Sequence, residues 1–478
     1  MNVLLINPFR YTGRQINVGV DPVVTRHAGQ EIKTGFTLPI GLCYIGAVLL
    51  KNGYQVKILD PVPQKLSIKE IYDTAAKSDA IIMPFSPAHS QATVKFLMDF
   101  KGRLRILTGG VARYFPEQLF EKDICEAIVY GEPELTILEL IKRFPEIEGV
   151  KGTFYRKDGK IIQAPPQPFI DSLDELPFPA RHLVDQRLYW DIFFLGEPTT
   201  WVITSRGCSY DCIFCAEYDT YGKNVRFRNP ERVVDEIGHV KRDYGINNFA
   251  FFDPNFNMSN SHVVSICREI IKRKLKFRWW CAGRADLIKP DTVQLMKEAG
   301  CQEIRIGLES ANDDILKYLK KSITVEKFLT GIDILKRERM NFSLHCIFGS
   351  LPETMETVNN TVKMVKSLRP LFVSFNLLTP MPGSQLFLQQ RDRLKLEDIA
   401  SFNLIHTENS FCDFSDDALK RILRYAYRAY YFSPGFLLTV FGRLVTKPGD
   451  FFRMCGTLFR QGVYIMALIL DRKTHDET

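Results

Sequence analysis

Short apolar strands alternate with helical segments along most of the first 380 residues, and this alternation restricts the chain to few folds. The first apolar run covers residues 2–6, and four more follow at similar intervals, at 54–60, 79–83, 105–110 and 127–130. Between them, apolar residues recur at helical spacing. Strands that alternate with helices pair in parallel, with helices on both faces of the sheet. Residues 1–145 therefore predict a doubly wound, Rossmann-like α/β domain.

A second alternating series begins with the strand at 201–204 and ends with the strand at 371–378. Four further strands lie between them, at 248–252, 277–281, 303–308 and 343–348. Six strands are fewer than the eight of a closed barrel, so the series predicts an open, partial (β/α)6 barrel. Ligands of parallel sheets and barrels bind beyond the carboxyl ends of the strands.

The 478 residues suggest about three structural units, at about 150 residues per domain. We expect a Rossmann-like domain over 1–145, a connector over 146–195, the partial barrel over 196–400 and a helical C-terminal cap over 401–478. The connector contains a hairpin with Asp158-Gly159 at its turn and two proline-rich runs.

Three cysteines lie in the loop after the first strand of the second series. Cys208, Cys212 and Cys215 have the spacing C-x-x-x-C-x-x-C. Three thiolates can hold three irons of a cubane 4Fe–4S cluster, which leaves the fourth iron open for chemistry. Gly207 lets the loop bend tightly, and Phe214 is held between the last two ligands. The alternatives are a structural zinc site or three unrelated core thiols, but zinc requires a fourth cysteine or histidine at short spacing. His239 lies beyond that distance.

The cysteine motif and its apolar lead-in, Trp201-Val-Ile-Thr204, resemble the radical S-adenosylmethionine (SAM) superfamily. In that superfamily the open iron chelates the amino and carboxylate groups of SAM. The ends of the five later strands resemble the cobalamin-dependent enzymes of the superfamily, and this similarity covers about residues 204–387. It implies a SAM site formed by Phe214, Asp253, Arg284, Glu309, Ser310 and Leu351.

The segment 38–50, the Gly109-Gly110 pair and Gly131-Glu132 together resemble the cobalamin-binding domain that precedes many radical SAM domains, and the similarity covers about residues 1–140. The resemblance implies contacts to cobalamin from Pro8, Leu42, Ser86, Gly109, Gly110, Val111, Gly131 and Glu132. The chain lacks the D-x-H-x-x-G motif whose histidine ligates cobalt in other cobalamin enzymes. His89 is an alternative ligand, but nothing around it has ligand spacing, and a histidine at a helix start is the simpler interpretation.

The resemblance implies a radical SAM enzyme with a 4Fe–4S cluster, SAM and cobalamin as cofactors, which transfers a methyl group to a carbon centre through a 5′-deoxyadenosyl radical. Two alternatives remain open. One is oxidative cyclisation or ring rearrangement of the kind run by the anaerobic magnesium-protoporphyrin ester cyclases. The other is a cobalamin or iron–sulfur protein without turnover. No single residue can be assigned as catalytic, and the substrate is expected to be a small or hydrophobic molecule.

The formal charge of +8 is concentrated near the C-terminus, where residues 418–470 contain eight Lys or Arg and one Asp. Arginines alternate there with aromatic residues at helical spacing. Such a segment can cap the barrel or lie in a membrane interface, and both interpretations remain open. The scattered, odd number of cysteines and the strand-like N-terminus favour a reducing cytoplasm. We also expect an electron donor such as flavodoxin or ferredoxin and no nucleic-acid partner.

Overall fold

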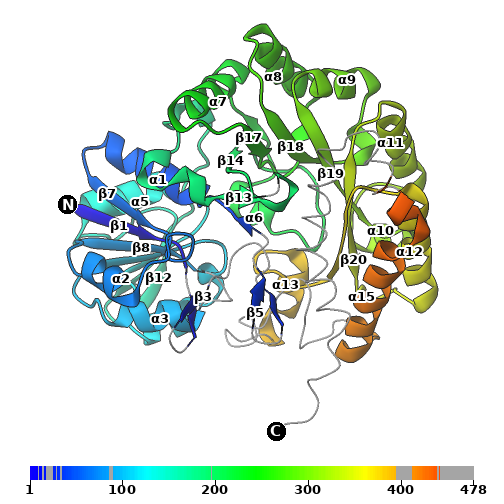
Figure 1. The fold of residues 1–478 in the computed structure, drawn as a ribbon. Coiled ribbons are helices and arrows are strands. Elements are labelled where there is room, and N and C mark those ends of the chain that lie inside the picture. Colours follow the sequence, from blue (N-terminus) through cyan, green and yellow to red (C-terminus); the bar gives the residue numbers. More distant parts are fainter. Residues whose placement is uncertain are drawn as a thin grey trace.

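The chain forms an α/β fold with two parallel sheets covered by helices, as the alternation predicts (Figure 1). The computed structural model describes residues 1–8, 10–12, 15–17, 25–27, 30–32, 35–85, 90–194, 196–393, 412–438 and 441.

The first sheet has seven strands, five of them parallel. In spatial order they are β12 (Lys160–Gln163), β11 (Thr153–Lys157), β10 (Ala127–Val129), β9 (Leu104–Thr108), β8 (Ala80–Pro84), β1 (Asn2–Ile6) and β7 (Gln55–Leu59). Five helices belong to it: α1 (Ile40–Lys51), α2 (Ile68–Ala75), α3 (Ser90–Met98), α4 (Pro116–Glu121) and α5 (Pro133–Arg143).

Side chains along β1, β8, β9 and β10 alternate between two hydrophobic cores. Leu5 and Ile106 pack with α1 and α5, whereas Leu4 and Ile128 pack with α2, α3 and α4 on the other face. A strand that is buried on both faces must be apolar at nearly every position, which is why these strands could be recognised as continuous apolar runs.

The predicted connector hairpin extends the first sheet. Strand β11 pairs antiparallel with β10 and thereby covers an edge whose N–H and C=O groups would otherwise lack partners. Asp158 and Gly159 at its turn have φ of 50° and 75°, which is the positive backbone geometry that the turn pair predicts. Residues 153–163 therefore belong with the first sheet instead of a separate connector.

The second sheet has six strands, all parallel. They are β14 (Thr199–Val202), β17 (Asn248–Phe251), β18 (Arg278–Gly283), β19 (Cys301–Glu309), β20 (Phe342–Phe348) and β21 (Val373–Leu377). Its helices are α7 (Pro230–Tyr244), α8 (Asn260–Lys272), α9 (Pro290–Glu298), α10 (Asp313–Tyr318), α11 (Val325–Arg337) and α12 (Met355–Leu368). In Figure 1 the helices lie along the outer side of this curved sheet.

Helix α15 (Asp416–Tyr431) covers the free edge of the second sheet at β21. The hydroxyl of Tyr427 accepts from the N–H of Phe375 and lies 3.1 Å from its carbonyl oxygen. Tyr431 forms the same pair of hydrogen bonds with Val373. This helix is thus a cap on the sheet, which supports the first of the two interpretations for residues 418–431.

The remaining elements are short. They are β2 (Arg10–Thr12), β3 (Gln15–Asn17), β4 (Thr25–His27), β5 (Gln30–Ile32), β6 (Gly35–Phe36), β13 (Trp190–Asp191), β15 (Ser205–Arg206), β16 (Arg226–Phe227), α6 (Glu217–Tyr221) and α13 (Gln385–Gln390). Within the described part of the chain, no helix is both long and apolar enough to span a bilayer.

The two sheets share a core through α13, which follows the last strand of the second sheet. Its Phe387 is fully buried among residues of the first sheet's core. The Phe387 ring lies 5.0 Å from the ring of Tyr114 and 6.3 Å from that of Phe115.

Candidate functional site

The three cysteines lie on one loop between β15 and α6. Gly207, which opens the loop, has a φ of 92°, and a Cβ there would lie 2.4 Å from the carbonyl oxygen of Asn224. Only glycine fits this turn, as predicted. Cys212 is buried, while Cys208 and Cys215 are partly exposed.

All three thiols are free of disulfides. Burial raises the pKa of each, for Cys215 to about 11. A neighbouring cation is therefore needed to hold them as thiolates. Among the described residues, no three His, Cys, Asp or Glu side chains converge in the way that a single bound ion requires. Thiolates on a cubane bind separate irons, so the cluster ligands stay a prediction.

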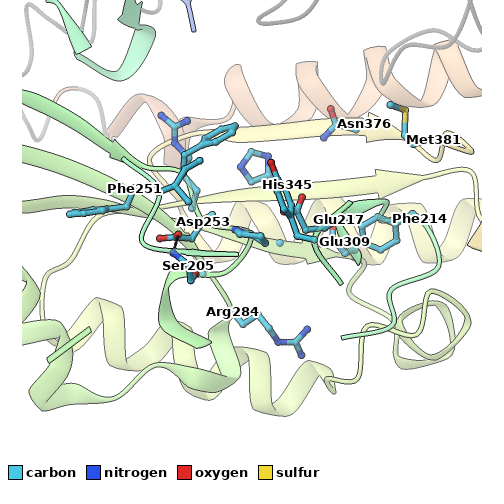
Figure 2. A pocket seen from close by; sticks show the side chains of 18 of the residues that line it. Ser205, Phe214, Glu217, Phe251, Asp253, Arg284, Glu309, His345, Asn376 and Met381 are labelled. Carbon is cyan, nitrogen blue, oxygen red and sulfur yellow. Dashed lines mark hydrogen bonds between the residues drawn. The ribbon is translucent and has the colours of Figure 1, made fainter. Parts of the chain in front are cut away.

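A cavity of about 790 Å³ adjoins the cysteine loop (Figure 2). The loop contributes Phe214 and the following helix contributes Glu217. Strand ends of the second sheet supply most of the remaining wall, and α1 of the first sheet supplies Ile40, Gly41 and Tyr44. Because the carboxyl ends of parallel strands meet at one edge, residues far apart in sequence line one space.

Four of the predicted SAM-site residues line this cavity, namely Phe214, Asp253, Arg284 and Glu309. Asp253, just after β17, is buried and accepts hydrogen bonds from the N–H groups of Thr204 and Ser205, at 2.7 and 2.6 Å. Burial raises its pKa to about 6, although these donors oppose the rise. Its carboxylate thus joins β17 to the segment that leads into the cysteine loop.

Glu309 forms a buried ion pair with Lys321, whose Nζ lies 2.6 Å from its Oε1. Burial by itself would lower the pKa of Lys321, but the charge of Glu309 reverses this effect and the pKa is raised. Gly307 makes room for the pair, since a Cβ there would lie 2.1 Å from Glu309 Oε1 and 2.7 Å from Lys321 Nζ. The cavity therefore contains an ion pair without net charge at the end of β19.

Arg284 is held by the protein on several sides. Its guanidinium carbon lies 3.6 Å from the ring centre of Tyr210 in the cysteine loop. Its Nε lies 3.0 Å from Asp286, and its Nη1 donates to the carbonyl of Lys321 at 2.9 Å. Arg284 thereby ties the cysteine loop to the segments after β18 and α10.

Two predicted SAM-site residues do not line the cavity. Ser310 is fully buried, and its hydroxyl accepts from the side-chain amide of Asn312 at 3.0 Å. Leu351 is 52% exposed. Both residues follow strand ends, but one side chain is buried within the protein and the other is exposed at the surface.

Most of the predicted cobalamin residues follow strands of the first sheet, and none of those that the structure describes lines the cavity. Leu42 is buried in the core between the first sheet and α1. Both carboxylate oxygens of Glu132 are used by Arg206, Arg226 and the N–H of Ile170. Ser86 and the alternative ligand His89 lie outside the described residues.

Glycines at these strand ends differ in the space around them. A Cβ at Gly131, or at Gly41 in α1, would meet no atom within 4 Å. A Cβ at Gly110 would lie 3.6 Å from the Asp219 carboxylate of α6. Of the glycines predicted to contact cobalamin, Gly131 therefore has open space beside it, whereas Gly110 lies against a side chain.

Sequence reasoning missed several lining residues, among them Tyr44, Glu217, Arg305, Lys321, His345 and Asn376. Burial, with the charges of Arg305 and Lys321, lowers the pKa of His345 to about 4. The guanidinium carbon of Arg305 lies 3.6 Å from the ring centre of Trp280, and Arg305 also pairs with Asp191 at 3.1 Å. His345 and Asn376 could have been found from the period-two pattern, because alternate residues of β20 and β21 face inward.

The model of the radical SAM superfamily matches residues 202–365. An uncharacterized methyltransferase of Pyrococcus horikoshii is 29% identical over 84% of this chain and 89% of its own length. The anaerobic magnesium-protoporphyrin IX monomethyl ester cyclase of Rubrivivax gelatinosus is 26% identical over 79% of this chain and 71% of its own.

Among solved structures, the fold is similar to that of TsrM from Kitasatospora setae, a radical SAM methyltransferase with cobalamin and a 4Fe–4S cluster bound. The TM-score is 0.65 and the identity 19%, over 82% of this chain and 75% of TsrM. The matched residues include the cysteine loop and the ends of β14, β17, β18, β19 and β20. Residues 202–365 therefore match the radical SAM superfamily.

Proposed function

We propose that the protein is a cobalamin-dependent radical SAM enzyme that transfers a methyl group to a carbon centre of a small or lipid-like molecule. One observation carries the proposal: a single cavity is bounded by the cysteine loop, by the strand ends of the second sheet and by α1 of the first sheet. Such a space can bring a group bound at either sheet to the same substrate.

The residues present fit the three cofactors. The cysteine loop, which lines the cavity through Phe214, offers three free thiols, and the pair of Glu309 with Lys321 offers a carboxylate and an ammonium for the polar end of SAM. Open space above Gly41 and Gly131 lets a large ligand approach the backbone near the first sheet. When bound and reduced, a 4Fe–4S cluster supplies the electron that cleaves SAM and yields a 5′-deoxyadenosyl radical.

The chain's own residues would orient the reactants and exclude water. Phe214 and Trp280 give the cavity apolar surface, and the Arg, Lys and Glu side chains around it are largely paired. The partial barrel over 196–400, a cobalamin domain over about 1–145 and the cap over 401–478 are parts of this proposal.

Anaerobic reconstitution tests the enzyme assignment. The protein should bind iron and sulfide in the ratio of a 4Fe–4S cluster and, after reduction, convert SAM to 5′-deoxyadenosine. Replacement of Cys208, Cys212 and Cys215 by alanine should abolish both. Protein that binds a cluster without cleaving SAM would instead support the alternative without turnover.

The cyclase relative favours oxidative cyclisation or rearrangement as a second candidate function. Methyl transfer consumes a further SAM and releases S-adenosylhomocysteine, whereas cyclisation does not. Chromatography of the reduced reaction mixture should therefore show S-adenosylhomocysteine together with 5′-deoxyadenosine. Sustained 5′-deoxyadenosine formation with substrate and without S-adenosylhomocysteine would favour the cyclase type.

We further propose two partners. One is a flavodoxin or ferredoxin as electron donor, which can be tested by replacing the chemical reductant. The other is an anionic membrane surface contacted through 418–470, supported by the exposed Phe432, Leu438 and Phe441 and the exposed Arg421 and Arg428. Sedimentation with anionic but not neutral vesicles at low salt would support this contact.

A further inference from the structure

A buried group of four charged side chains joins the start of the cysteine loop to the first sheet. Arg206 lies in β15, two residues before Cys208, and Glu132 and Glu134 lie at the start of α5. Arg206 Nη1 is 3.0 Å from Glu132 Oε1, and Arg206 Nη2 is 2.5 Å from Glu134 Oε1. Arg226, opposite Arg206 in β16, lies 2.9 Å from Glu132 Oε2.

Water has almost no access to this group. The side chains of Arg206, Glu132 and Glu134 are 3%, 1% and 2% exposed. Two guanidinium groups face two carboxylates, so the charges balance. A buried ion pair is strongly destabilised when one partner is removed, because the other charge is left without compensation in a medium of low dielectric constant.

Aromatic rings enclose the Arg206 guanidinium from segments on either side of the loop. Its central carbon lies 5.4 Å from the ring centre of Tyr44 in α1 and 5.2 Å from that of Tyr221 at the end of α6. Arg206, Tyr44 and Tyr221 all line the cavity. One guanidinium thus contacts the first sheet through α5 and α1 and the far end of the cysteine loop through α6.

We propose that Arg206 is a positioning residue that fixes the cysteine loop against the start of α5, so that the strand ends of the second sheet and α1 of the first sheet face one cavity at a set separation. The inference rests on the proposed function, because that function requires cofactors on both sides of the cavity. Arginine suits this role better than lysine, since its planar fork can engage two carboxylates at once and its guanidinium can also contact aromatic rings.

The test compares Arg206→Lys with Arg105→Lys. Arg105 is a matched control, because it is also buried and pairs with Glu126 at 2.6 Å, but it lies within the first sheet and away from the loop. Glu134→Gln is a second variant, which keeps the contact of Arg206 with Glu132. Each reconstituted protein is examined by thermal unfolding, by hydrogen exchange of peptides covering 205–216, and by electron paramagnetic resonance of the reduced cluster with and without SAM.

We expect the two lysine variants to unfold at similar temperatures. Only Arg206→Lys should show faster exchange over 205–216 and an altered spectral change on addition of SAM. Its rate of reductive SAM cleavage should fall about tenfold to 100-fold, the size of effect that a displacement of about 1 Å can have. Glu134→Gln should change the same readouts in the same direction and by less, and it decides the question if Arg206→Lys fails to fold.

The inference is overturned if Arg206→Lys and Glu134→Gln match Arg105→Lys in loop exchange and in the spectrum with SAM. Failure of the proposed function has a different signature, since the unmodified protein would then bind no cluster or would not cleave SAM. In that case the exchange of 205–216 in Arg206→Lys still decides whether Arg206 holds the loop.

Discussion

Gly307 leaves the space that the ion pair of Glu309 and Lys321 occupies. Its Cα faces the space that Glu309 and Lys321 occupy, and Glu309 itself has a φ of 61°, where β19 departs from regular pairing with β20. Such backbone geometry in a residue other than glycine costs free energy and persists only where the surroundings enforce it. The pair is therefore held in place by the strand as well as by its charges.

Gly307→Ala should displace Glu309 and Lys321, because the added Cβ would overlap both side chains. We expect SAM to bind at least about tenfold more weakly, which corresponds to about 1.4 kcal/mol, while the iron content stays unchanged. Equilibrium dialysis with SAM and iron analysis measure the two effects. Gly238→Ala in α7 is the control, since a Cβ there meets no atom within 4 Å. Unchanged SAM affinity in Gly307→Ala would contradict the role given to the pair.

His345 makes the stability of the fold depend on pH. Its pKa falls from 6.5 to about 4 in the folded protein, so the folded state holds the imidazole neutral. The stabilisation is complete above pH 6.5 and is lost as the pH falls toward 4. His345→Gln should therefore lose less stability than the original protein between pH 7 and pH 5. Urea unfolding at both pH values measures this difference, and equal losses in the two proteins would contradict it.

Helix α15 takes the place that a further strand would have in a closed barrel. An open sheet edge presents unpaired N–H and C=O groups that attract other chains. Here the hydroxyls of Tyr427 and Tyr431 pair with those groups on β21. The edge is thus satisfied by side chains from a helix.

The double change of Tyr427 and Tyr431 to phenylalanine tests this capping. It keeps the aromatic packing and removes the hydroxyls from a buried edge. We expect a loss of about 2–6 kcal/mol in the free energy of unfolding, at about 1–3 kcal/mol for each of the two hydroxyl sites removed. Denaturant unfolding measures the loss. The matched control is Tyr425→Phe on the exposed face of α15, which should cost much less.

Strands and helices could be predicted from sequence because buried parallel strands are apolar throughout and the helices repeat with their own period. The pairing of the hairpin 153–163 with the first sheet could not be predicted from sequence, since it depends on which edge of the folded sheet is free. The three cysteines were recognisable from local spacing alone. By contrast, the pairing of Lys321 with Glu309 and the approach of Tyr44 depend on contacts between distant segments, which local patterns do not encode.

On the scale of the whole molecule, the two sheets are joined by apolar packing as well as by charge. Phe387 of α13 is fully buried against Tyr114 and Phe115, and Asp219 of α6 lies 2.9 Å from both Arg113 Nη1 and the Tyr114 hydroxyl. The second half of the chain thereby completes the core of the first.

Phe387→Ala should weaken the first sheet although it lies far from that sheet in sequence. Removal of a buried phenylalanine costs about 3–5 kcal/mol. We expect hydrogen exchange in peptides from β8 and β9 to accelerate accordingly, while β18 and β19 change less. Leu388→Ala, at a neighbouring position that is 46% exposed, is the control and should have little effect. Equal acceleration in both sheets would indicate global destabilisation and contradict the expected local effect.

The burial of Phe387 also bears on how the protein is made. Strand β12 completes the first sheet at Gln163, yet the core beneath that sheet stays unfinished until the ribosome has passed residue 387. At about 5–20 residues per second, the delay is roughly 10 to 45 seconds. During that time the apolar surface beside Tyr114 that Phe387 later covers is exposed to other nascent chains. Chaperones that bind nascent chains should therefore raise the yield of the native protein.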